Sequence, residues 1–363
     1  MEIVYGETGG EIIWREEDTL VLEFPRPRLV CSTSSLNGGI SEGIRAVFNQ
    51  ECPPVDTAQE LPGGSVKAYF TYIAQKRGLK PEETTGLLTA ASQQNAAVSC
   101  LSFRDLTVLA VATAGIDHNG GRPGDPASYY EENGRFHLLA GTINILLAVN
   151  ACLPPPTLLK AIITATEAKT SALLELLAPS CYSVELATGS GTDGIIIAAD
   201  PTAGLELTDA GHHSKLGELI GKTVREAIKK ALELETGFTP ERQLNLLARL
   251  KRYGIDERLI WEDFQKHNSG CLAQDYYSSI LNRLAVQPEL VSCFSSVVHL
   301  ADQVRWGLLP LEAAWTAAQG SLRAVGIEPE QAVSCSGHGA GKEIPLIQAL
   351  IKGLHELVLK EAS

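Results

Sequence analysis

Continuous apolar runs rich in β-branched residues constrain the fold of this chain more than any other feature. Residues 106–113 carry no charged side chain and are followed by Gly115, and their length and composition are typical of a buried β-strand. Residues 143–149 and 194–199 form two further runs of this kind. All three are far too short to span a bilayer. We therefore expect a sheet whose strands are buried inside a globular domain.

Other segments of the first two thirds of the chain predict further strands and helices. Two short apolar stretches between residues 11 and 24, separated by the acidic residues 16–18, predict a hairpin. Residues 29–33 predict another strand. Helices are predicted by apolar spacing over residues 66–77, 84–93 and 158–177. The clearest is an amphipathic helix over residues 214–234, for which Ser214 is the expected N-cap.

The sequence after this amphipathic helix marks a domain boundary. Gly237 is suited to end a helix, and Pro240 is suited to the first position of a new one. We therefore expect an α/β domain with a mixed sheet over residues 1–238 and an α-helical domain over residues 239–363. In the second domain, helices are predicted over residues 241–253, 257–266, 276–284 and 344–360.

Composition excludes several classes of function. The 363 residues carry a net charge of −13, which repels phosphate backbones and anionic lipids, so we expect neither nucleic acid nor a membrane as a partner. The start of the chain lacks the basic and apolar pattern of a secretory signal. The eight cysteines are widely spaced without a C-x-x-C pair, so a cysteine zinc site is not expected. These features predict a cytoplasmic protein with small, buried, reduced cysteines.

Five segments combine glycine with polar side chains in a way that packing alone does not require. They are residues 32–39, 113–127, 141–145, 187–194 and 211–221. Taken together and in this order, they resemble the adenosylcobinamide amidohydrolase family, over residues of about 31–234. The resemblance implies hydrolysis of the amide that joins aminopropanol to a propionate arm of the corrin ring. The implied products are adenosylcobyric acid and 1-amino-2-propanol, in cobamide salvage.

The resemblance also implies which partners the protein needs. A corrinoid is the small-molecule substrate, and no metal or cofactor is added because the cobalt belongs to that substrate. The region beyond Pro240 has no counterpart in the family pattern, so its role stays open. The sequence is compatible with a homo-oligomer but does not specify one. The alternative function is a corrinoid-binding or handover protein without hydrolytic activity.

Thr142 is the preferred nucleophile for such an amidohydrolase. It follows Gly141 directly and precedes an apolar strand, a long helix and the glycine-rich residues 188–193. This order also resembles the ornithine acetyltransferase and β-aminopeptidase superfamily, whose Thr or Ser nucleophile is exposed by self-cleavage. By that resemblance the Gly141–Thr142 bond is cut. Asn144 would share the face of Thr142 on a strand. The alternative is that Thr142 is a strand residue whose hydroxyl binds neighbouring backbone.

The glycine-rich residues 188–194 offer many backbone N–H groups that could hold an oxyanion, an amide or the adenosyl group. Thr188, Gly189 and Thr192 are therefore candidate substrate-binding residues. Asp193 is a candidate catalytic residue that could orient a second group or accept a hydrogen bond from the substrate. The alternative is a tight turn in which Asp193 binds its own backbone.

Further candidates lie on the loops that follow the predicted strands and at the start of the amphipathic helix. Asn37, Gly38 and Gly115 follow buried strands, where binding loops commonly emerge, and Asp125 could bind substrate amides. His213 stands at a helix start, where the dipole favours a neutral ring that can act as a base. Turn formation for Asp125 and helix capping for His213 are the alternatives.

The C-terminal domain offers weaker signals. Residues 337–342 loosely resemble a phosphate-binding loop, but the loop is one residue short and has Glu343 where Ser or Thr would bind magnesium. We therefore reject a nucleotide site. His299 or His338 could ligate a corrinoid cobalt, although a lone histidine is usually structural.

Overall fold

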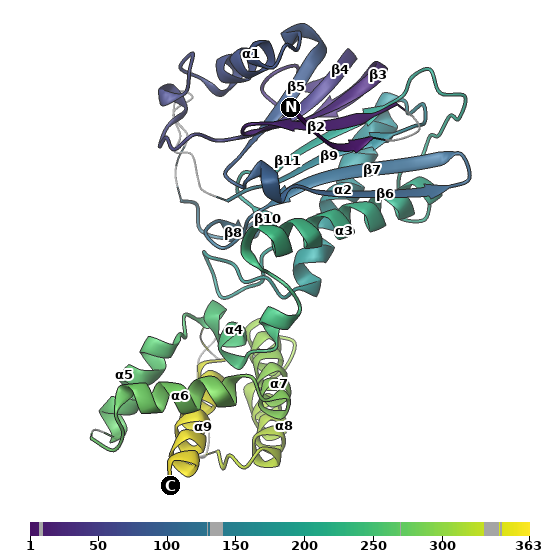
Figure 1. Cartoon of the computed structure of the whole chain (residues 1–363). Helices are drawn as coiled ribbons and strands as arrows, with labels where there is room; N and C mark the ends of the chain where they lie inside the picture. The colour runs from purple at the N-terminus through teal and green to yellow at the C-terminus, as the bar shows by residue number, and fades with distance from the viewer. Residues whose placement is uncertain (7–9, 129, 131–140, 269, 330–340, 342) are drawn as a thin grey trace. The chain divides into compact units, whose positions relative to one another are not determined.

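The computed structural model describes residues 1–6, 10–128, 130, 141–268, 270–329, 341 and 343–363. The chain forms two compact units, Met1–Thr239 and Pro240–Ser363 (Figure 1). The first unit is a mixed α/β structure and the second is helical, as the sequence predicts.

The first unit contains a mixed sheet of nine strands and three α-helices among its described residues. Its elements are β1 (Glu2–Gly6), β2 (Ile12–Glu16), β3 (Thr19–Ser32), β4 (Gly39–Glu51), α1 (Val66–Lys76), β5 (Thr84–Thr89), β6 (Ala97–Phe103), β7 (Leu106–Ala114), β8 (Gly120–Gly121), β9 (Ile143–Val149), α2 (Pro155–Glu175), β10 (Gly189–Ser190), β11 (Gly194–Ala199) and α3 (Lys215–Thr236). The sheet order is β1-β2-β3-β11-β9-β7-β6, with β4 on the other edge of β3 and β5 beyond β4. Strands β8 and β10 form a separate short pair.

Strand β3 connects two parts of this sheet. One edge of β3 pairs with β4 along most of its length, whereas the other edge pairs first with β2 and then with β11. The register with β4 shifts between Glu23 and Arg28, where Pro25 and Pro27 lie. Proline has no N–H to donate to the ladder, so the regular pairing is interrupted there. The sheet can therefore change direction within a single strand.

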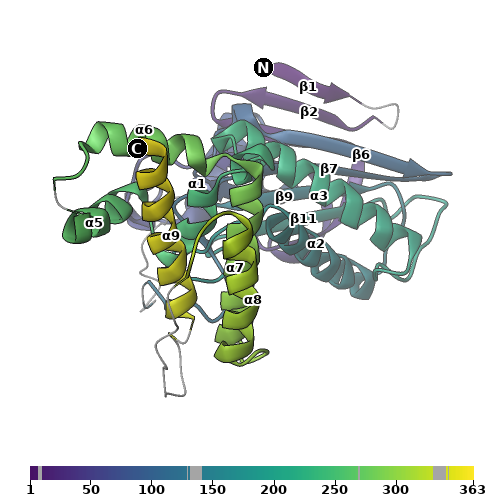
Figure 2. The ribbon, with the colours of Figure 1, turned by 90° about the horizontal axis from the view of Figure 1, so that it is seen from below.

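The two parts of the sheet pack face to face around an apolar layer. Strands β2–β5 supply one side of this layer and strands β7, β9 and β11 the other, with Leu22, Val111 and Ile196 among its residues. Helix α1 covers the outer face of the first part. Helices α2 and α3 lie side by side on the outer face of the second part (Figure 2). The unit is thus built of four layers: helix, sheet, sheet, helices (Figure 1).

Strands β9 and β11 are parallel neighbours in the centre of the second part. All residues of both strands are buried, which agrees with their continuous apolar sequences. Parallel neighbours need a crossover connection, and α2 is that connection. This arrangement brings the amino ends of β9 and β11 to the same edge of the sheet.

The second unit contains six α-helices among its described residues. They are α4 (Leu246–Leu250), α5 (Glu257–Asn268), α6 (Gln274–Ala285), α7 (Pro288–Arg305), α8 (Leu311–Ala324) and α9 (Ile344–Ala362). Their apolar faces form one core that includes Phe264, Tyr277 and Phe294. The predicted glycine-rich loop over residues 337–342 and His338 lie outside the described residues, apart from Gly341.

The structure confirms most of the predicted elements and overturns three details. The helix predicted over residues 84–93 is wrong, because β5 pairs in parallel with β4 and the helical turn that follows covers only Gln93–Asn95. The strand predicted over residues 29–33 is the second half of the long β3. The helix predicted over residues 241–253 is broken into α4 and two short 3₁₀ turns, because Asn245 caps a new start.

Among the described helices, none is by itself long and apolar enough to cross a membrane. The pair α6 and α7 has that length and composition only when the two are taken together, and it is bent by 82° at the break.

Candidate active site

The hydroxyls of Thr142 and Thr192 meet at the amino ends of the parallel strands β9 and β11. Thr142 directly precedes β9, and Thr192 stands two residues before β11. Their Oγ1 atoms lie 2.7 Å apart. Asn144, two residues after Thr142, pairs with Gly194 at the start of β11. The crossover topology therefore brings together two segments that are 50 residues apart in the chain.

The carboxylate of Asp193 forms hydrogen bonds that connect these two segments. Its carboxylate accepts hydrogen bonds from the backbone N–H of Ile143 at 3.1 Å and from Ser190 Oγ at 2.6 Å. It also forms a buried ion pair with Lys169 of α2. A side chain at Gly189 would overlap both partners of this pair, so the loop needs glycine there. The Asp193 carboxylate thus binds donors from three segments of the chain. These bonds hold the loop before β11 against the start of β9.

The carbonyl oxygen of Gly141 accepts two side-chain hydrogen bonds. Asn119 Nδ2 donates to it at 2.9 Å and Thr192 Oγ1 at 3.0 Å. Tyr182 OH donates to Asn119 Oδ1 at 2.7 Å, which fixes the orientation of the Asn119 amide. Gly141 has φ of +94°, a backbone conformation that favours glycine. Two hydrogen bonds therefore fix the position of the Gly141 carbonyl, which directly precedes Thr142.

A chain of buried amides continues into the layer between the sheets. Asn144 Nδ2 donates to Asn49 Oδ1 at 2.7 Å and to the carbonyl of Leu88 at 2.9 Å. Asn49 Nδ2 in turn donates to Thr113 Oγ1 at 2.8 Å. These bonds hold β9 against β4 and β5, so they orient the face that carries Thr142 and Asn144.

A cavity of about 580 Å³ adjoins this cluster. Thr142, Asn144, Thr192 and Asp193 line it, as does Ser34. Much of the remaining lining is apolar and contains Pro53, Pro54, Val55, Val66, Phe70, Leu87 and Leu88. The described lining contains no histidine; its ionisable groups are Cys52, Asp56 and Asp193. Burial raises the pKa of the Cys52 thiol, which keeps it protonated near neutral pH.

Comparison with known proteins assigns the chain to a family. Residues 4–240 match the sequence pattern of the adenosylcobinamide amidohydrolases. The chain belongs to the adenosylcobinamide amidohydrolase family. It is accordingly a hydrolase that acts on an amide, as the resemblance in the sequence predicts.

Two curated relatives match more than half of the chain. The uncharacterized protein MJ1613 of Methanocaldococcus jannaschii is 36% identical over 229 residues, which are 60% of this chain and 86% of the relative. The adenosylcobinamide amidohydrolase of Methanosarcina mazei is 30% identical over 210 residues, which are 56% of this chain and 89% of the relative. The PH0078 protein of Pyrococcus horikoshii aligns over 59% of this chain and 76% of its own. Its TM-score of 0.30 and identity of 11% are too low to bear on the fold.

The structure gives several predicted binding residues of this amidohydrolase a structural role. Asn37 donates from Nδ2 to the carbonyls of Pro81 and Thr84, each at 2.7 Å, and so attaches the β3–β4 turn to the start of β5. A side chain at Gly38 would overlap the carbonyl of Ser34. Neither Asn37 nor Gly38 lines the cavity.

Three more predicted residues support the loops around the cluster. The backbone N–H of Gly115 donates to the carbonyl of Thr142 at 3.1 Å, so this donor is already used. The carbonyl of Thr188 accepts from Thr170 Oγ1 of α2 at 3.1 Å. Asp125 accepts from Ser180 Oγ at 2.7 Å; partial burial alone would raise its pKa, but hydrogen bonds from Ser183 and Ser180 outweigh burial and lower it.

His213 does not join the cluster around Thr142. It is exposed just before α3, where the next-but-one residue, Lys215, places its ammonium 4.6 Å from the ring centroid of Phe103. Phe103 lies at the β6–β7 turn, whereas Thr142 adjoins the other end of β7. Strand β7 spans about 27 Å between those ends. The prediction that His213 assists proton transfer is therefore not supported by its position.

Sequence reasoning missed Asn119 and Tyr182 as members of the cluster, whereas Lys169 was a candidate to reach the site from its helix, with a solvated, salt-bridged helix face as the alternative. Asn119 was part of a glycine-rich segment, but nothing in the sequence pairs it with Tyr182, 63 residues away. Lys169 carried a usable signal, because it interrupts the small, buried face that Ala165, Ala168 and Ala172 form on α2. A buried lysine needs an anionic partner.

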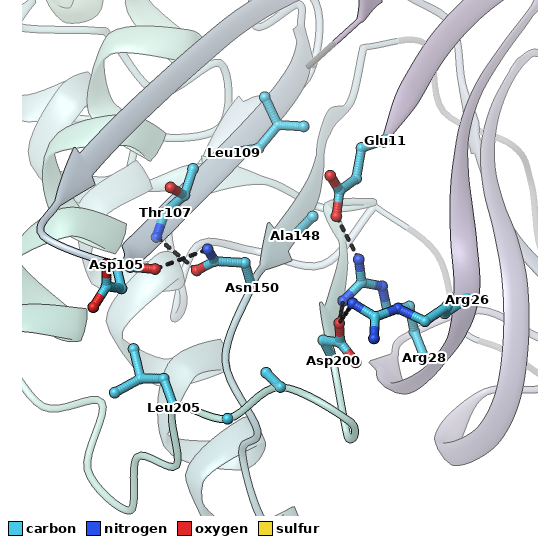
Figure 3. A pocket seen from close by; sticks show the side chains of 12 residues that line it. Glu11, Arg26, Arg28, Asp105, Thr107, Leu109, Ala148, Asn150, Asp200 and Leu205 are labelled. Atoms are coloured by element: carbon cyan, nitrogen blue, oxygen red, sulfur yellow. Dashed lines mark hydrogen bonds and ion pairs between the residues drawn. The ribbon is translucent and has the colours of Figure 1, made fainter. Parts of the chain in front are cut away.

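A second cavity, of about 730 Å³, lies at the carboxyl ends of β9 and β11 (Figure 3). Buried Arg28 contacts Glu11 on one side and Asp200 on the other, and the more exposed Arg26 also reaches Asp200 at 3.2 Å. The positive charges of these two guanidinium groups are equal in number to the negative charges of the two carboxylates. Across the cavity, Asn150 bonds to backbone atoms of Asp105 and Thr107. We interpret the group as an ion network that closes this end of the sheet layers.

Among the described residues, no group of three or more histidine, cysteine, aspartate or glutamate side chains is arranged to hold a metal ion.

Proposed function

We propose that the N-terminal unit hydrolyses the amide between aminopropanol and a propionate arm of adenosylcobinamide, giving adenosylcobyric acid and 1-amino-2-propanol in cobamide salvage. Membership of the family and the activity named for the Methanosarcina mazei relative support this reaction. We propose further that the protein works in the cytoplasm, without an added metal or cofactor. The substrate brings its own cobalt.

The cluster around Thr142 is the observation that carries this proposal. An amide hydrolase needs a nucleophile, donors for the developing oxyanion and a group that carries the proton to the departing amine. Thr142 presents a hydroxyl to the cavity, and the loop before β11 lies against it. The cavity takes the aminopropanol arm, and its apolar wall faces the methyl group of that arm.

The base in this proposal is the α-amine of Thr142 itself. In the intact chain the Thr142 hydroxyl is bonded to another hydroxyl, Thr192, which is not a base at neutral pH. Cleavage of the Gly141–Thr142 bond frees an α-amine beside the Thr142 hydroxyl, and such amines have an ordinary pKa of about 7.7–8.0. The donors on the Gly141 carbonyl support this cleavage, because they are placed to stabilise the oxyanion that it forms.

The other predicted residues have supporting roles in this proposal. Asp193 positions the loop of Thr192 through its ion pair with Lys169, and Asn144 orients the start of β9. Thr188 and Gly189 shape the same loop. We assign no role in the reaction to His213, Asn37, Gly38 or Asp125.

Incubation of the full-length protein with adenosylcobinamide tests the proposal. Mass spectrometry is expected to detect 1-amino-2-propanol and adenosylcobyric acid in equal amounts. If the corrinoid binds but neither product forms, the handover alternative replaces hydrolysis.

A further inference from the structure

We infer that Asn119 and Thr192 form the oxyanion-binding pair of this site, with Tyr182 as the residue that positions Asn119. This inference deepens the proposed function, since it rests on Thr142 as the nucleophile. It assigns a catalytic role to Asn119, whose amide would contact the reacting carbonyl oxygen in both reactions of the site.

The distances suit this role. Donors that stabilise an oxyanion lie about 2.7–3.1 Å from its oxygen. Asn119 Nδ2 and Thr192 Oγ1 lie 2.9 and 3.0 Å from the oxygen of the intact Gly141 carbonyl, the atom that becomes the oxyanion when Thr142 attacks. They approach it from two different loops, one before β8 and one before β11. Two donors that converge on one carbonyl next to a hydroxyl residue form the pattern expected for nucleophilic attack on that carbonyl.

Burial strengthens the Asn119 contribution. Asn119 is 0% exposed, so its amide dipole acts in a poorly screened environment. Its orientation is set, because Tyr182 OH donates to Oδ1 and leaves Nδ2 directed at Gly141. Gly121 makes room for the tyrosine: a side chain there would lie 3.0 Å from the Tyr182 ring. A preorganised donor pays little reorganisation cost when charge develops.

The first reaction at the pair is cleavage of the chain. Thr142 Oγ forms a bond to the Gly141 carbonyl carbon, and the carbonyl oxygen becomes an oxyanion held by Asn119 and Thr192. The bond from that carbon to the Thr142 nitrogen then breaks, and the proton of the hydroxyl passes to the nitrogen. Water hydrolyses the resulting ester, which leaves a Gly141 carboxylate and a Thr142 with a free hydroxyl and a free amine.

The second reaction is hydrolysis of the substrate. The amide carbonyl of the corrinoid arm takes the position that the Gly141 carbonyl has left, and its oxyanion uses the same two donors. The Thr142 amine accepts the hydroxyl proton and passes it to the departing aminopropanol. Water then hydrolyses the acyl-enzyme and regenerates Thr142. In the uncut chain the donors are occupied by Gly141, so cleavage has to precede turnover.

Four variants of the full-length protein test the inference. Asn119→Ala removes the donor, Asn119→Asp replaces it by an acceptor of the same shape, and Tyr182→Phe removes only the positioning bond. Asn150→Ala is the control, because it also removes an amide that forms two hydrogen bonds, here with backbone atoms of Asp105 and Thr107, but it lies at the opposite end of β9 from Thr142. Intact-mass measurement follows chain cleavage, steady-state kinetics follow adenosylcobinamide hydrolysis, and thermal unfolding follows stability.

The wild-type chain is expected to be cut between Gly141 and Thr142. Asn119→Ala and Asn119→Asp are expected to slow cleavage about 100- to 1000-fold while they stay folded. Tyr182→Phe should slow it about five- to tenfold, and Asn150→Ala should not slow it. In chains that do become cut, kcat for hydrolysis should fall by the same factors with little change in KM, which a purely structural role of Asn119 would not produce.

Two results would overturn the inference. One is an Asn119→Ala protein that is cut and hydrolyses substrate within threefold of wild type. The other is a wild-type chain that hydrolyses the substrate while uncut, because Gly141 would then occupy the donors in the active enzyme. A wild-type chain that is cut, but releases no aminopropanol, contradicts the proposed function and leaves the role of Asn119 in cleavage supported.

Discussion

Thr142 Oγ1 and Thr192 Oγ1 lie 2.7 Å apart, although 50 residues separate them in the chain. The distance is set by two adjacent parallel strands that start at the same edge and by Asp193, which bonds to both segments. Substitutions of the residues that support this pair, such as Asp193 and Lys169, should therefore alter both stability and activity.

Lys169→Met should destabilise the first unit strongly. Lys169 and Asp193 are almost completely buried, with side chains 9% and 12% exposed, and the substitution leaves the carboxylate without its counter-charge. Loss of one partner of a buried pair costs about 3–5 kcal/mol. Urea unfolding measures the change in the free energy of unfolding.

Two further proteins separate this effect from a general loss of charge. Lys169→Met with Asp193→Asn removes both charges and should recover part of the stability. Lys229→Met breaks the more exposed pair with Glu175 and should cost less than about 1 kcal/mol. Equal losses for Lys169→Met and Lys229→Met would mean that the Lys169 pair is not buried as described.

Gly189→Ala should destabilise the loop before β11. The added methyl group would overlap Asp193 and Lys169, so one of them has to move. Overpacking of this kind costs about 1–3 kcal/mol. Gly204→Ala is the control, because nothing lies within 4 Å of the added carbon, and it should change stability by no more than about 0.5 kcal/mol. Thermal unfolding of both variants distinguishes them.

The stability of the helical unit should fall in mild acid because of His355. Burial lowers the pKa of His355 below its ordinary value of 6.5, although the hydrogen bond to Asp263 acts in the opposite direction. The folded state thus binds a proton less readily than the unfolded state. The stabilisation is complete above pH 6.5 and is lost as the pH falls from there toward the folded pKa. Urea unfolding of the full-length protein at a series of pH values measures this loss.

His355→Gln should reduce that dependence on pH. In the native state His355 Nε2 donates to Asp263 and Nδ1 accepts from Tyr277 OH, so the variant should also be less stable at pH 8. His299→Gln, on the exposed side of α7, should keep the wild-type slope. If His355→Gln retains the same slope between pH 7.5 and 5.5, other groups cause the acid sensitivity.

Local signals sufficed for most elements of the fold. Ser214 caps α3 through a hydrogen bond to the N–H of Gly217, and Gly237 ends it in the left-handed conformation, as the sequence predicts. The strand at Thr84–Thr89 was mistaken for a helix because its short sequence fits either state. Its parallel pairing with β4, more than 30 residues earlier, decides between them. No local rule contains that contact.

The candidate site could be predicted only in part, for the same reason. Thr142, Thr192 and Asp193 stand next to buried strands, where sequence patterns place binding loops. The other residues of the cluster come from distant parts of the chain. Asn119 lies in the loop before β8, Tyr182 in the segment after α2, and Lys169 on α2 itself. The sequence places His213 at a helix start, where the dipole favours a neutral ring, but its distance from Thr142 depends on how α3 lies across the sheet.

Replacement of Thr142 tests the central claim most directly. Steady-state release of 1-amino-2-propanol from adenosylcobinamide is measured for wild type, Thr142→Ser and Thr142→Ala, with thermal unfolding to show that each is folded. Wild type and Thr142→Ser are expected to turn over, the latter more slowly. Thr142→Ala is expected to be at least about 1000-fold slower, since loss of a nucleophile removes the covalent route. A folded Thr142→Ala protein that releases the amine at a rate close to wild type would contradict the account.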